Sequence, residues 1–410
     1  MKEWIESEDF LSFIRSGGKW LDVRAPIEYE DHQLPNSINL SILNDTERAE
    51  IGTLYKKSGQ ADAVARGHQL VSGAVKEERI LGWKNLLENH PEMAITCARG
   101  GMRSALAQEW LADAGVQRPR ARGGVKALRD FYSDSFARLI KHPFCTVGGP
   151  TGSGKTILLN ELRALELKGL TRPATLDLEA LAHHRGSAFG STQNPQPGQA
   201  TFENRVAHRL IELEAANIKL DNSQLNSQLN SQASSQASSQ PKAQLNSVTN
   251  SQQELAHAWF VESESRMIGQ IVLMPELHRT INLSPLIHVR ESLETRVENT
   301  FQEYIQQTSL NGDDDQAALL VFESYKKSLS KISKKLGSQR TLEIGQMIAA
   351  CESDYLKSRE TCGNRSWIRE LLIQYYDPMY EHGMKTRGGK IAFEGNRNQC
   401  LLFMRDVSFL

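Results

Sequence analysis

The sequence predicts an α/β protein with two α/β domains in succession and a mainly helical C-terminal region. Two stretches share one pattern, in which a short apolar strand enters a glycine turn and then a helix: residues 95–115 and 144–165. From residue 291 onward the pattern is charged and helical, as in residues 291–307 and 365–383. A chain of 410 residues has room for two or three domains, and we place them at 1–140, 141–290 and 291–410.

The composition is that of an ordinary soluble protein, with 39% hydrophobic and 24% charged residues. The net charge of −1 means that contact with a polyanion requires a local basic patch. The N-terminus is acidic where a signal peptide would be basic, and no apolar run is long enough to span a membrane. Five cysteines are scattered without a paired motif. We therefore expect a cytoplasmic protein without membrane contact.

Short patterns predict the individual elements. In the first domain, residues 20–24 and 95–97 are expected to be buried strands, and residues 104–115 a helix. In the second, a strand and helix are expected within 176–186, a buried strand ending in acids within 258–266, and a strand-like segment within 390–410. The Ser-, Gln- and Asn-rich residues 219–254 contain too few apolar side chains to offset the entropy of ordering, so we expect a disordered insertion there.

The first candidate site is the loop at residues 97–104. Cys97 stands at the end of a strand, before a helix N-terminus, and is flanked by Arg99, Gly100, Gly101 and Arg103. Backbone N–H groups, the helix dipole and two guanidinium groups would favour the thiolate, which predicts a nucleophilic cysteine in an anion cradle. The alternative is a buried, inert cysteine, the usual fate of a free thiol.

The second candidate site is a phosphate loop. Gly149 is followed after four residues by Gly154, Lys155 and Thr156, which is a complete Walker A motif between a predicted strand and helix. Lys155 would contact the terminal phosphates and Thr156 would hold Mg²⁺, so the second domain is expected to be P-loop NTPase-like. Glu262 and Glu264 are candidates for a contact to metal-bound water, or else form an acidic cap on a strand. The expected phosphate-binding residues are Gly149, Thr151, Gly152, Ser153, Gly154, Lys155 and Thr156.

The N-terminal motifs resemble a known domain family. The cysteine loop, residues 21–40 (LDVRAPIEYEDHQLPNSINL) and residues 121–131 (ARGGVKALRDF) are similar to rhodanese domains, which implies that Cys97 carries sulfur as a persulfide. Asp22 and Arg24 match a strand-end pair that we interpret as structural. Five residues separate Cys97 from Arg103, one more than in the commonest sulfurtransferase loop. Rhodanese-like phosphatases use that longer form, so phosphate chemistry stays open.

The order of the two domains extends the resemblance. A rhodanese domain followed by a P-loop domain, with residues 183–190, 194–204, 261–269 and 375–383, resembles bacterial tRNA 2-selenouridine synthases over nearly the whole chain. The resemblance implies a transferase acting on 2-thiouridine at the tRNA wobble position. Geranyl diphosphate would first alkylate the sulfur, and selenium from selenophosphate would then displace the geranylthio group. No tightly bound cofactor is implied; Mg²⁺ is a candidate ion.

The resemblance to a tRNA enzyme directs attention to basic residues. The candidates for tRNA contact are Arg118, Arg120, Arg122, Lys126, Arg129 and Arg185. The alternative for the run at 118–141 is a solvated basic face. His183 and His184 are adjacent, but no second ligand cluster has a suitable spacing, so no metal site is expected from them. The Tyr375, Tyr376 and Tyr380 cluster would stack on a base or an isoprenoid chain, or else pack between helices.

Two other functions fit parts of the pattern. One is an ATP-dependent sulfurtransferase acting on tRNA or another acceptor, in which the Walker loop uses ATP and the cysteine passes sulfur. The other is a binding module that docks tRNA or a partner without chemistry. The complete cysteine loop and the complete Walker A motif argue against the second. Which tRNAs are used and the oligomeric state do not follow from the sequence.

Overall fold

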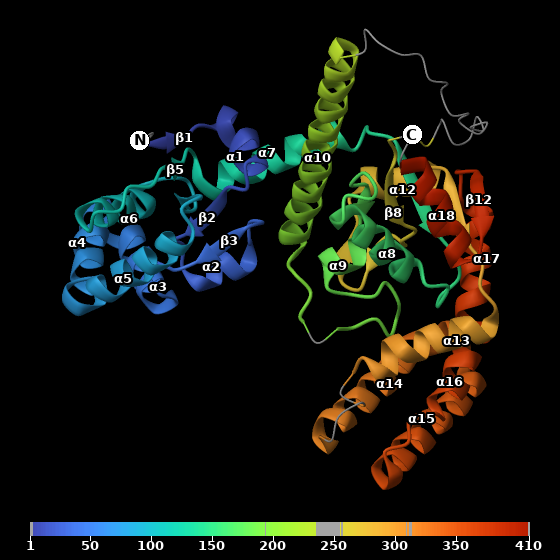
Figure 1. The fold of residues 1–410 in the computed structure, drawn as a ribbon. Coiled ribbons are helices and arrows are strands. Elements are labelled where there is room, and N and C mark those ends of the chain that lie inside the picture. Colours follow the sequence, from blue (N-terminus) through green and yellow to red (C-terminus); the bar gives the residue numbers. More distant parts are fainter. Residues whose placement is uncertain are drawn as a thin grey trace. The chain divides into compact units, whose positions relative to one another are not determined.

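The chain forms two compact units in a computed structural model that describes residues 3–192, 194–234, 255, 257–308, 310 and 314–408 (Figure 1). Unit 1 comprises Met1–Leu139 and Pro197–Ala215, and unit 2 comprises Ile140–Gln196 and Ala216–Leu410. Each unit contains a parallel five-stranded sheet, which confirms the predicted α/β class. Residues 291–410 share unit 2 with the phosphate loop.

The sheet of unit 1 has the strand order β1-β5-β4-β2-β3. Its strands are β1 (Trp4–Ile5), β2 (Lys19–Asp22), β3 (Ser37–Asn39), β4 (Met93–Thr96) and β5 (Arg120–Ala121). All pairings are parallel, so the carboxyl ends of the strands lie along one edge. The predicted strands near residues 20 and 95 are confirmed as β2 and β4.

Helices cover this sheet and bury its apolar residues. They are η1 (Ser7–Asp9), α1 (Phe10–Arg15), α2 (Pro26–Asp31), α3 (Asp45–Ser58), α4 (Gln60–Leu70), α5 (Gly73–Asn89), α6 (Met102–Asp113) and α7 (Gly124–Leu139). Trp83 of α5 and Trp110 of α6 stack with ring centroids 6.2 Å apart inside the core. The predicted helix at 104–115 corresponds to α6, which thereby follows directly on the cysteine loop.

The sheet of unit 2 has the order β12-β11-β6-β8-β7, again entirely parallel. Its strands are β6 (Phe144–Gly148), β7 (Thr175–Leu176), β8 (Trp259–Glu262), β11 (Leu286–Val289) and β12 (Ile391–Gly395), and a hairpin of β9 (Met267–Ile268) and β10 (Ile271–Val272) stands apart. The flanking helices are α8 (Lys155–Leu167), α9 (Leu178–Ala182), α12 (Pro275–Leu283) and α18 (Arg397–Ser408). The central strand β6 leads into the phosphate loop, with β8 and β11 on either side.

The C-terminal tail corrects one expectation. The strand-like segment at 390–410 is a strand only as far as Gly395, and residues 397–408 form helix α18 beside α8 (Figure 1). Cys400, Met404 and Val407 are all fully buried. Their spacing of four and three residues is typical of a helix, whereas the strand-like prediction follows from the apolar residues of the strand that precedes them.

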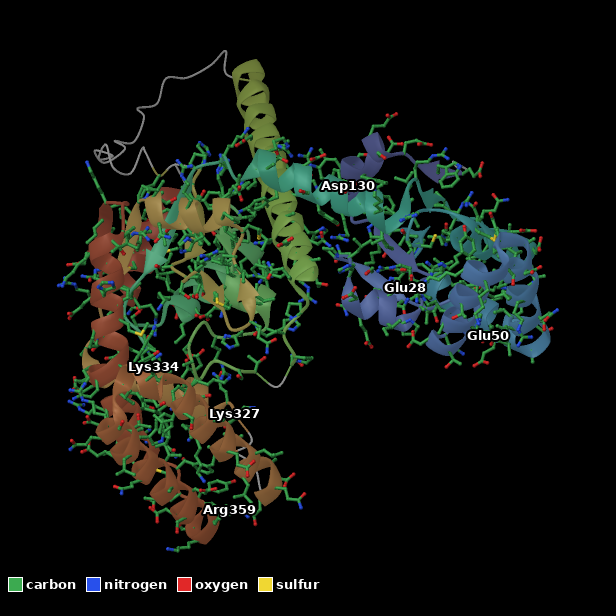
Figure 2. All side chains as sticks on the ribbon, turned by 180° about the vertical axis from the view of Figure 1, so that it is seen from behind. Glu28, Glu50, Asp130, Lys327, Lys334 and Arg359 are labelled. Carbon is green, nitrogen blue, oxygen red and sulfur yellow. The ribbon has the colours of Figure 1, made fainter. Side chains whose placement is uncertain are left out.

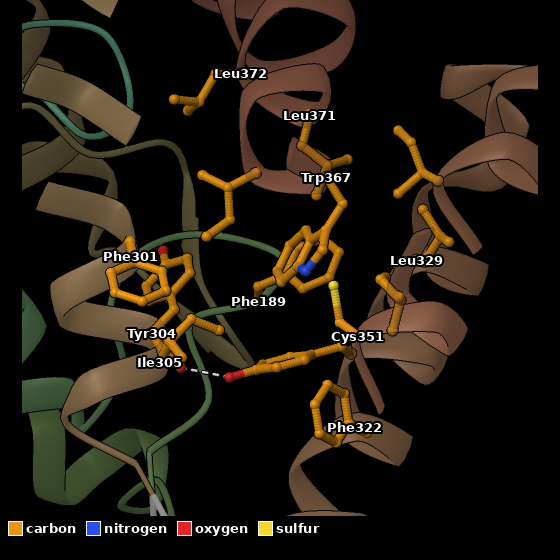
Figure 3. Close-up of a cluster of buried hydrophobic side chains, with 14 of the residues drawn as sticks. Phe189, Phe301, Tyr304, Ile305, Phe322, Leu329, Cys351, Trp367, Leu371 and Leu372 are labelled. Carbon is orange, nitrogen blue, oxygen red and sulfur yellow. Dashed lines mark hydrogen bonds between the residues drawn. The ribbon is translucent and has the colours of Figure 1, made fainter. Parts of the chain in front are cut away.

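The remaining helices form a separate apolar core within unit 2 (Figure 3). They are α13 (Leu293–Phe301), η2 (Gln302–Gln306), α14 (Asp315–Leu336), α15 (Ser338–Ser358), α16 (Asn364–Leu371) and η4 (Leu372–Tyr376). Helix α17 (Asp377–Thr386) continues η4 and contributes no buried residue to this core. Trp367 packs between Phe189 and Tyr325, with centroids 5.8 and 5.4 Å away. The Tyr325 hydroxyl donates to the carbonyl oxygen of Tyr304, which fixes α14 against η2.

Helix α10 (Gln199–Ser234) corrects a second expectation. The backbone is helical as far as Ser234, so the expectation of disorder is wrong for residues 219–234, and residues 235–254 lie outside the described residues. A helix that is already nucleated extends at little cost through residues such as Gln and Leu. Within the described ranges, no helix is both long enough and apolar enough to cross a membrane.

Candidate functional site

The phosphate loop occupies the turn between β6 and α8, the strand–loop–helix context that the Walker A motif requires. Helix α8 begins at Lys155, so its free N–H groups face the loop. The Lys155 ammonium donates to the Gly149 carbonyl oxygen at 3.1 Å, across the width of the loop. The geometry is that of a phosphate cradle.

Helix α13 holds this loop from outside. The Arg296 guanidinium donates from Nε to the Thr151 carbonyl oxygen at 2.9 Å, and Asn299 donates to the Gly152 carbonyl oxygen at 2.9 Å. Arg296 also forms an ion pair with Asp377 of α17, with Nη1 and Oδ2 3.1 Å apart. A Cβ on Gly152 would lie 2.5 Å from the Arg296 carbonyl oxygen, so glycine is required for this close approach. Sequence patterns had not identified Arg296 or Asn299.

Three carboxylates converge beside the loop. Glu262 ends β8, Glu264 follows it, and Glu179 comes from α9 after the neighbouring strand β7. One oxygen from each carboxylate lies within 4.8 Å of the others. Thr156 donates its hydroxyl to Glu179 Oε2 at 2.9 Å. The predicted pair Glu262 and Glu264 is therefore brought together with Thr156, and Glu179 joins them.

Burial and mutual repulsion disfavour the ionised form of these three carboxylates in the described structure. Burial raises the pKa of Glu264 to about 7, although the Lys155 ammonium opposes the shift. Burial and neighbouring carboxylates hold the pKa values of Glu179 and Glu262 well above their usual range. Among the described residues, buried Glu262 Oε1 has no hydrogen-bond partner. Clustered oxygens with an unsatisfied acceptor are a suitable environment for a hard divalent cation.

A cavity of about 1180 Å³ opens beside the loop and the carboxylates. The lining of the cavity also includes Tyr375, Tyr376, Met379, Tyr380 and Met384 of η4 and α17. The hydroxyl of Tyr380 is buried without a partner among the described residues, and a Cβ on Gly148 would lie 3.7 Å from it. A ligand with a phosphate end and an apolar end would therefore match both parts of this lining.

Packing between helices accounts for part of the tyrosine cluster, and stacking on a base or an isoprenoid chain stays a prediction. Tyr375 belongs to the helical core, where it is 9% exposed, whereas Tyr380 faces the cavity. Arg185 lines the same cavity, where its Nε lies 3.4 Å from Glu303 and its guanidinium covers the Tyr304 ring. His183 and His184 also line it. None of the three is part of the carboxylate cluster.

The cysteine loop of unit 1 connects β4 to α6. Cys97 is 2% exposed, and its thiol donates to the Ser104 hydroxyl at 3.2 Å. The N-terminus of α7 closes over the loop, because the Val125 N–H donates to the Cys97 carbonyl oxygen at 2.9 Å. Gly100 has a φ of +64°, and an added Cβ would lie 2.8 Å from the Ala121 carbonyl oxygen, which is too close for a side chain. Gly101 has a negative φ, and nothing lies within 4 Å of its Cβ position. The thiol of Cys97 is therefore buried in this structure, whereas a nucleophilic cysteine needs access to its substrate.

The two arginines of this loop have different environments. Arg99 is exposed, whereas Arg103 forms an ion pair with Glu28, with Nη2 and Oε1 3.2 Å apart. Asp22 and Arg24 form a buried ion pair at 2.7 Å, and Arg24 also donates to the carbonyl oxygens of α2 and the residue after it. This pair braces the strand end, in agreement with its structural interpretation.

Most of the basic residues predicted for tRNA contact are engaged inside unit 1. Arg118 donates to the Leu87 carbonyl oxygen, and Arg120 and Arg122 form ion pairs with Glu3 and Glu6 while covering the Trp4 ring. Lys126 lies 3.7 Å from Asp130. Only Arg129 of this group is exposed with no ion pair among the described residues.

Comparisons with known proteins agree with this arrangement. A family model described as "tRNA 2-selenouridine synthase AAA domain" matches residues 142–229 and 223–408. A protein of Bdellovibrio bacteriovorus named tRNA 2-selenouridine synthase is 36% identical over 402 residues, covering 95% of this chain and 94% of its own. A protein with the same name from Nitrosomonas eutropha is 35% identical, and the match covers 98% of this chain and 97% of that protein. A third, from Cronobacter sakazakii, is 36% identical, and the match covers 98% of this chain and 96% of that protein. The chain therefore belongs to the tRNA 2-selenouridine synthase family.

Proposed function

We propose that this enzyme converts 2-thiouridine at the wobble position of tRNA to 2-selenouridine through an S-geranyl intermediate. The observation that carries the proposal is the cavity of unit 2, which is lined both by the phosphate loop and by tyrosine and methionine side chains. A diphosphate with an isoprenoid tail has this same division into a charged end and an apolar end. The choice of tRNA as the substrate and of selenium as the transferred element follows from the name that the relatives share.

In the first step, the C–O bond of geranyl diphosphate breaks and a bond from that carbon to the thiouridine sulfur forms. Diphosphate leaves, and the base releases one proton. The N–H groups at the start of α8 and the Lys155 ammonium would stabilise the negative charge that develops on the diphosphate. Thr156, Glu179, Glu262 and Glu264 would hold Mg²⁺, which neutralises phosphate charge when bound.

In the second step, selenium from selenophosphate replaces the geranylthio group, and with one water the products are 2-selenouridine, geranylthiol and phosphate. We assign this step to unit 1, as a rhodanese-like domain in which Cys97 orients the selenium of the donor toward the base, while selenium stays at the selenide level throughout. The parallel sheet and the loop that Gly100 and Gly124 enclose support this assignment. Arg99 is exposed beside the loop and would attract the anionic donor.

The test is nucleoside mass spectrometry on thiolated tRNA incubated with the protein, geranyl diphosphate and selenophosphate. We expect geranylthiouridine when selenophosphate is omitted, and selenouridine when both donors are present. Lys155→Ala should abolish geranylation, whereas its control, Lys168→Ala at an exposed lysine, should not. Cys97→Ser should abolish selenation and preserve geranylation, whereas its control, Cys362→Ser at an exposed cysteine, should preserve both. Unchanged thiouridine together with ATP consumption would instead establish the ATP-dependent sulfurtransferase.

A further inference from the structure

Helix α14 carries an unbalanced row of positive charge. It contains five lysines and two carboxylate residues, and Lys327, Lys331 and Lys334 are all exposed. Their spacing of four and three residues places them on one face of the helix, and Figure 2 labels two of them. Within the described part of the chain, no carboxylate pairs with these three lysines, whereas the neighbouring Lys326 pairs with Glu352 of α15.

The opposite face of α14 is fixed in the protein. Phe322, Leu329 and Ile332 are buried in the helical core, so the lysine face cannot rotate inward without exposing them. Lys327 and Lys334 are seven residues apart, or about 10 Å along the axis. Successive phosphates of a nucleic-acid backbone are a few ångströms apart. A lysine row of this length can therefore contact more than one phosphate.

Helix α14 lies near the cavity of unit 2, and its buried face makes the contact. Tyr325 of α14 packs against Phe189, with centroids 6.3 Å apart, and Phe189 follows directly on the cavity-lining Ala188. Burial and then the positive charge of Lys331 lower the pKa of His184, which lines the cavity. A polyanion on the lysine face would therefore pass close to the candidate geranylation site.

We propose that Lys327, Lys331 and Lys334 bind the phosphate backbone of the substrate tRNA. The inference rests on the proposed function and adds the surface that this function needs. The chain as a whole has a net charge of −1, and the basic run at 118–129 is mostly engaged internally, so a local unpaired row is the stronger candidate. Lysines position a backbone without reading bases, so the face orients the tRNA while the cavity selects the nucleoside.

The experiment measures binding of fluorescently labelled, thiolated tRNA to the full chain at several KCl concentrations. The variant is Lys327→Glu, Lys331→Glu and Lys334→Glu together. The control reverses Lys56, Lys57 and Lys168 to Glu, three exposed lysines elsewhere that change the net charge equally. We expect the first variant to bind at least about tenfold more weakly and the salt slope of log K to fall by roughly 2 to 3. The control should stay close to wild type.

Two further measurements keep the result interpretable. Geranyl diphosphate binding by calorimetry should be unchanged in the triple variant, because none of the three lysines lines the cavity. The triple variant to Gln should give an intermediate salt slope. Unchanged tRNA affinity in the first variant, or an equal loss in the control, would overturn the lysine-face inference alone. A wild-type protein that binds no tRNA would overturn the proposed function as well.

Discussion

Gly124, at the start of α7, is held against the cysteine loop more tightly than a side chain allows. Its φ is +61°, and an added Cβ would lie 2.1 Å from the Cys97 carbonyl oxygen and 2.3 Å from the Gly100 nitrogen. Gly115 also has a positive φ, +83°, but nothing lies within 4 Å of its Cβ position. The pair Gly124→Ala and Gly115→Ala therefore separates the collision from the backbone strain that both share.

The expected cost follows from these contacts. Placing alanine in a left-handed conformation costs about 1–2 kcal/mol, and this applies to both variants. Only Gly124→Ala forces α7 away from the loop, which breaks the bonds from the Val125 N–H to Cys97 O (2.9 Å) and from the Lys126 N–H to Ala98 O (3.0 Å). At roughly 0.5–1.5 kcal/mol each, these two bonds add about 1–3 kcal/mol.

The assay is urea unfolding of the full chain, with hydrogen-exchange mass spectrometry on peptides from unit 1 to isolate that transition. Gly124→Ala should lower the free energy of unfolding by about 2–5 kcal/mol and Gly115→Ala by about 1–2 kcal/mol. Selenouridine formation should fall only in Gly124→Ala, because only that variant displaces Cys97. Equal destabilisation of the two variants, within about 0.5 kcal/mol, would refute the reasoning.

Three further predictions test other contacts. Burial raises the pKa of Glu264 to about 7, so between pH 5 and pH 8 the folded state retains a proton that the unfolded state releases. In calorimetry, Tm in metal-free buffer should therefore fall between pH 5 and pH 8, and Mg²⁺ should restore it. The variant Glu264→Gln should weaken both the pH effect and the Mg²⁺ effect. Tyr380→Ala should raise KM for geranyl diphosphate and leave inhibition by inorganic diphosphate unchanged, because only the apolar wall is altered. Arg24→Ala leaves Asp22 buried and unpaired and should cost about 3–5 kcal/mol in urea unfolding, whereas exposed Arg99→Ala should stay within about 0.5 kcal/mol.

Local features of the chain were predictable from sequence. The phosphate loop and the cysteine loop each lie within one strand–turn–helix segment, so glycine spacing and apolar period are sufficient to locate them. Glu179 carried a weaker signal, because it follows the end of β7 as Glu264 follows the end of β8. The helical period of residues 400–407 was also present in the sequence and was missed beside an apolar strand.

The partners of those loops were decided only by the tertiary structure. Arg296 and Asn299 reach the phosphate loop from a helix about 145 residues away in sequence, and Glu28 takes Arg103 from a helix 75 residues before it. Tyr380 lines the cavity from α17, where its ring stacks on His288 of β11 with the centroids 5.9 Å apart. No spacing rule encodes such contacts, since they depend on which faces of distant elements bury each other. The sequence by itself determined where the phosphate loop and the cysteine loop lie along this chain, and long-range packing decided which side chains contact and enclose them.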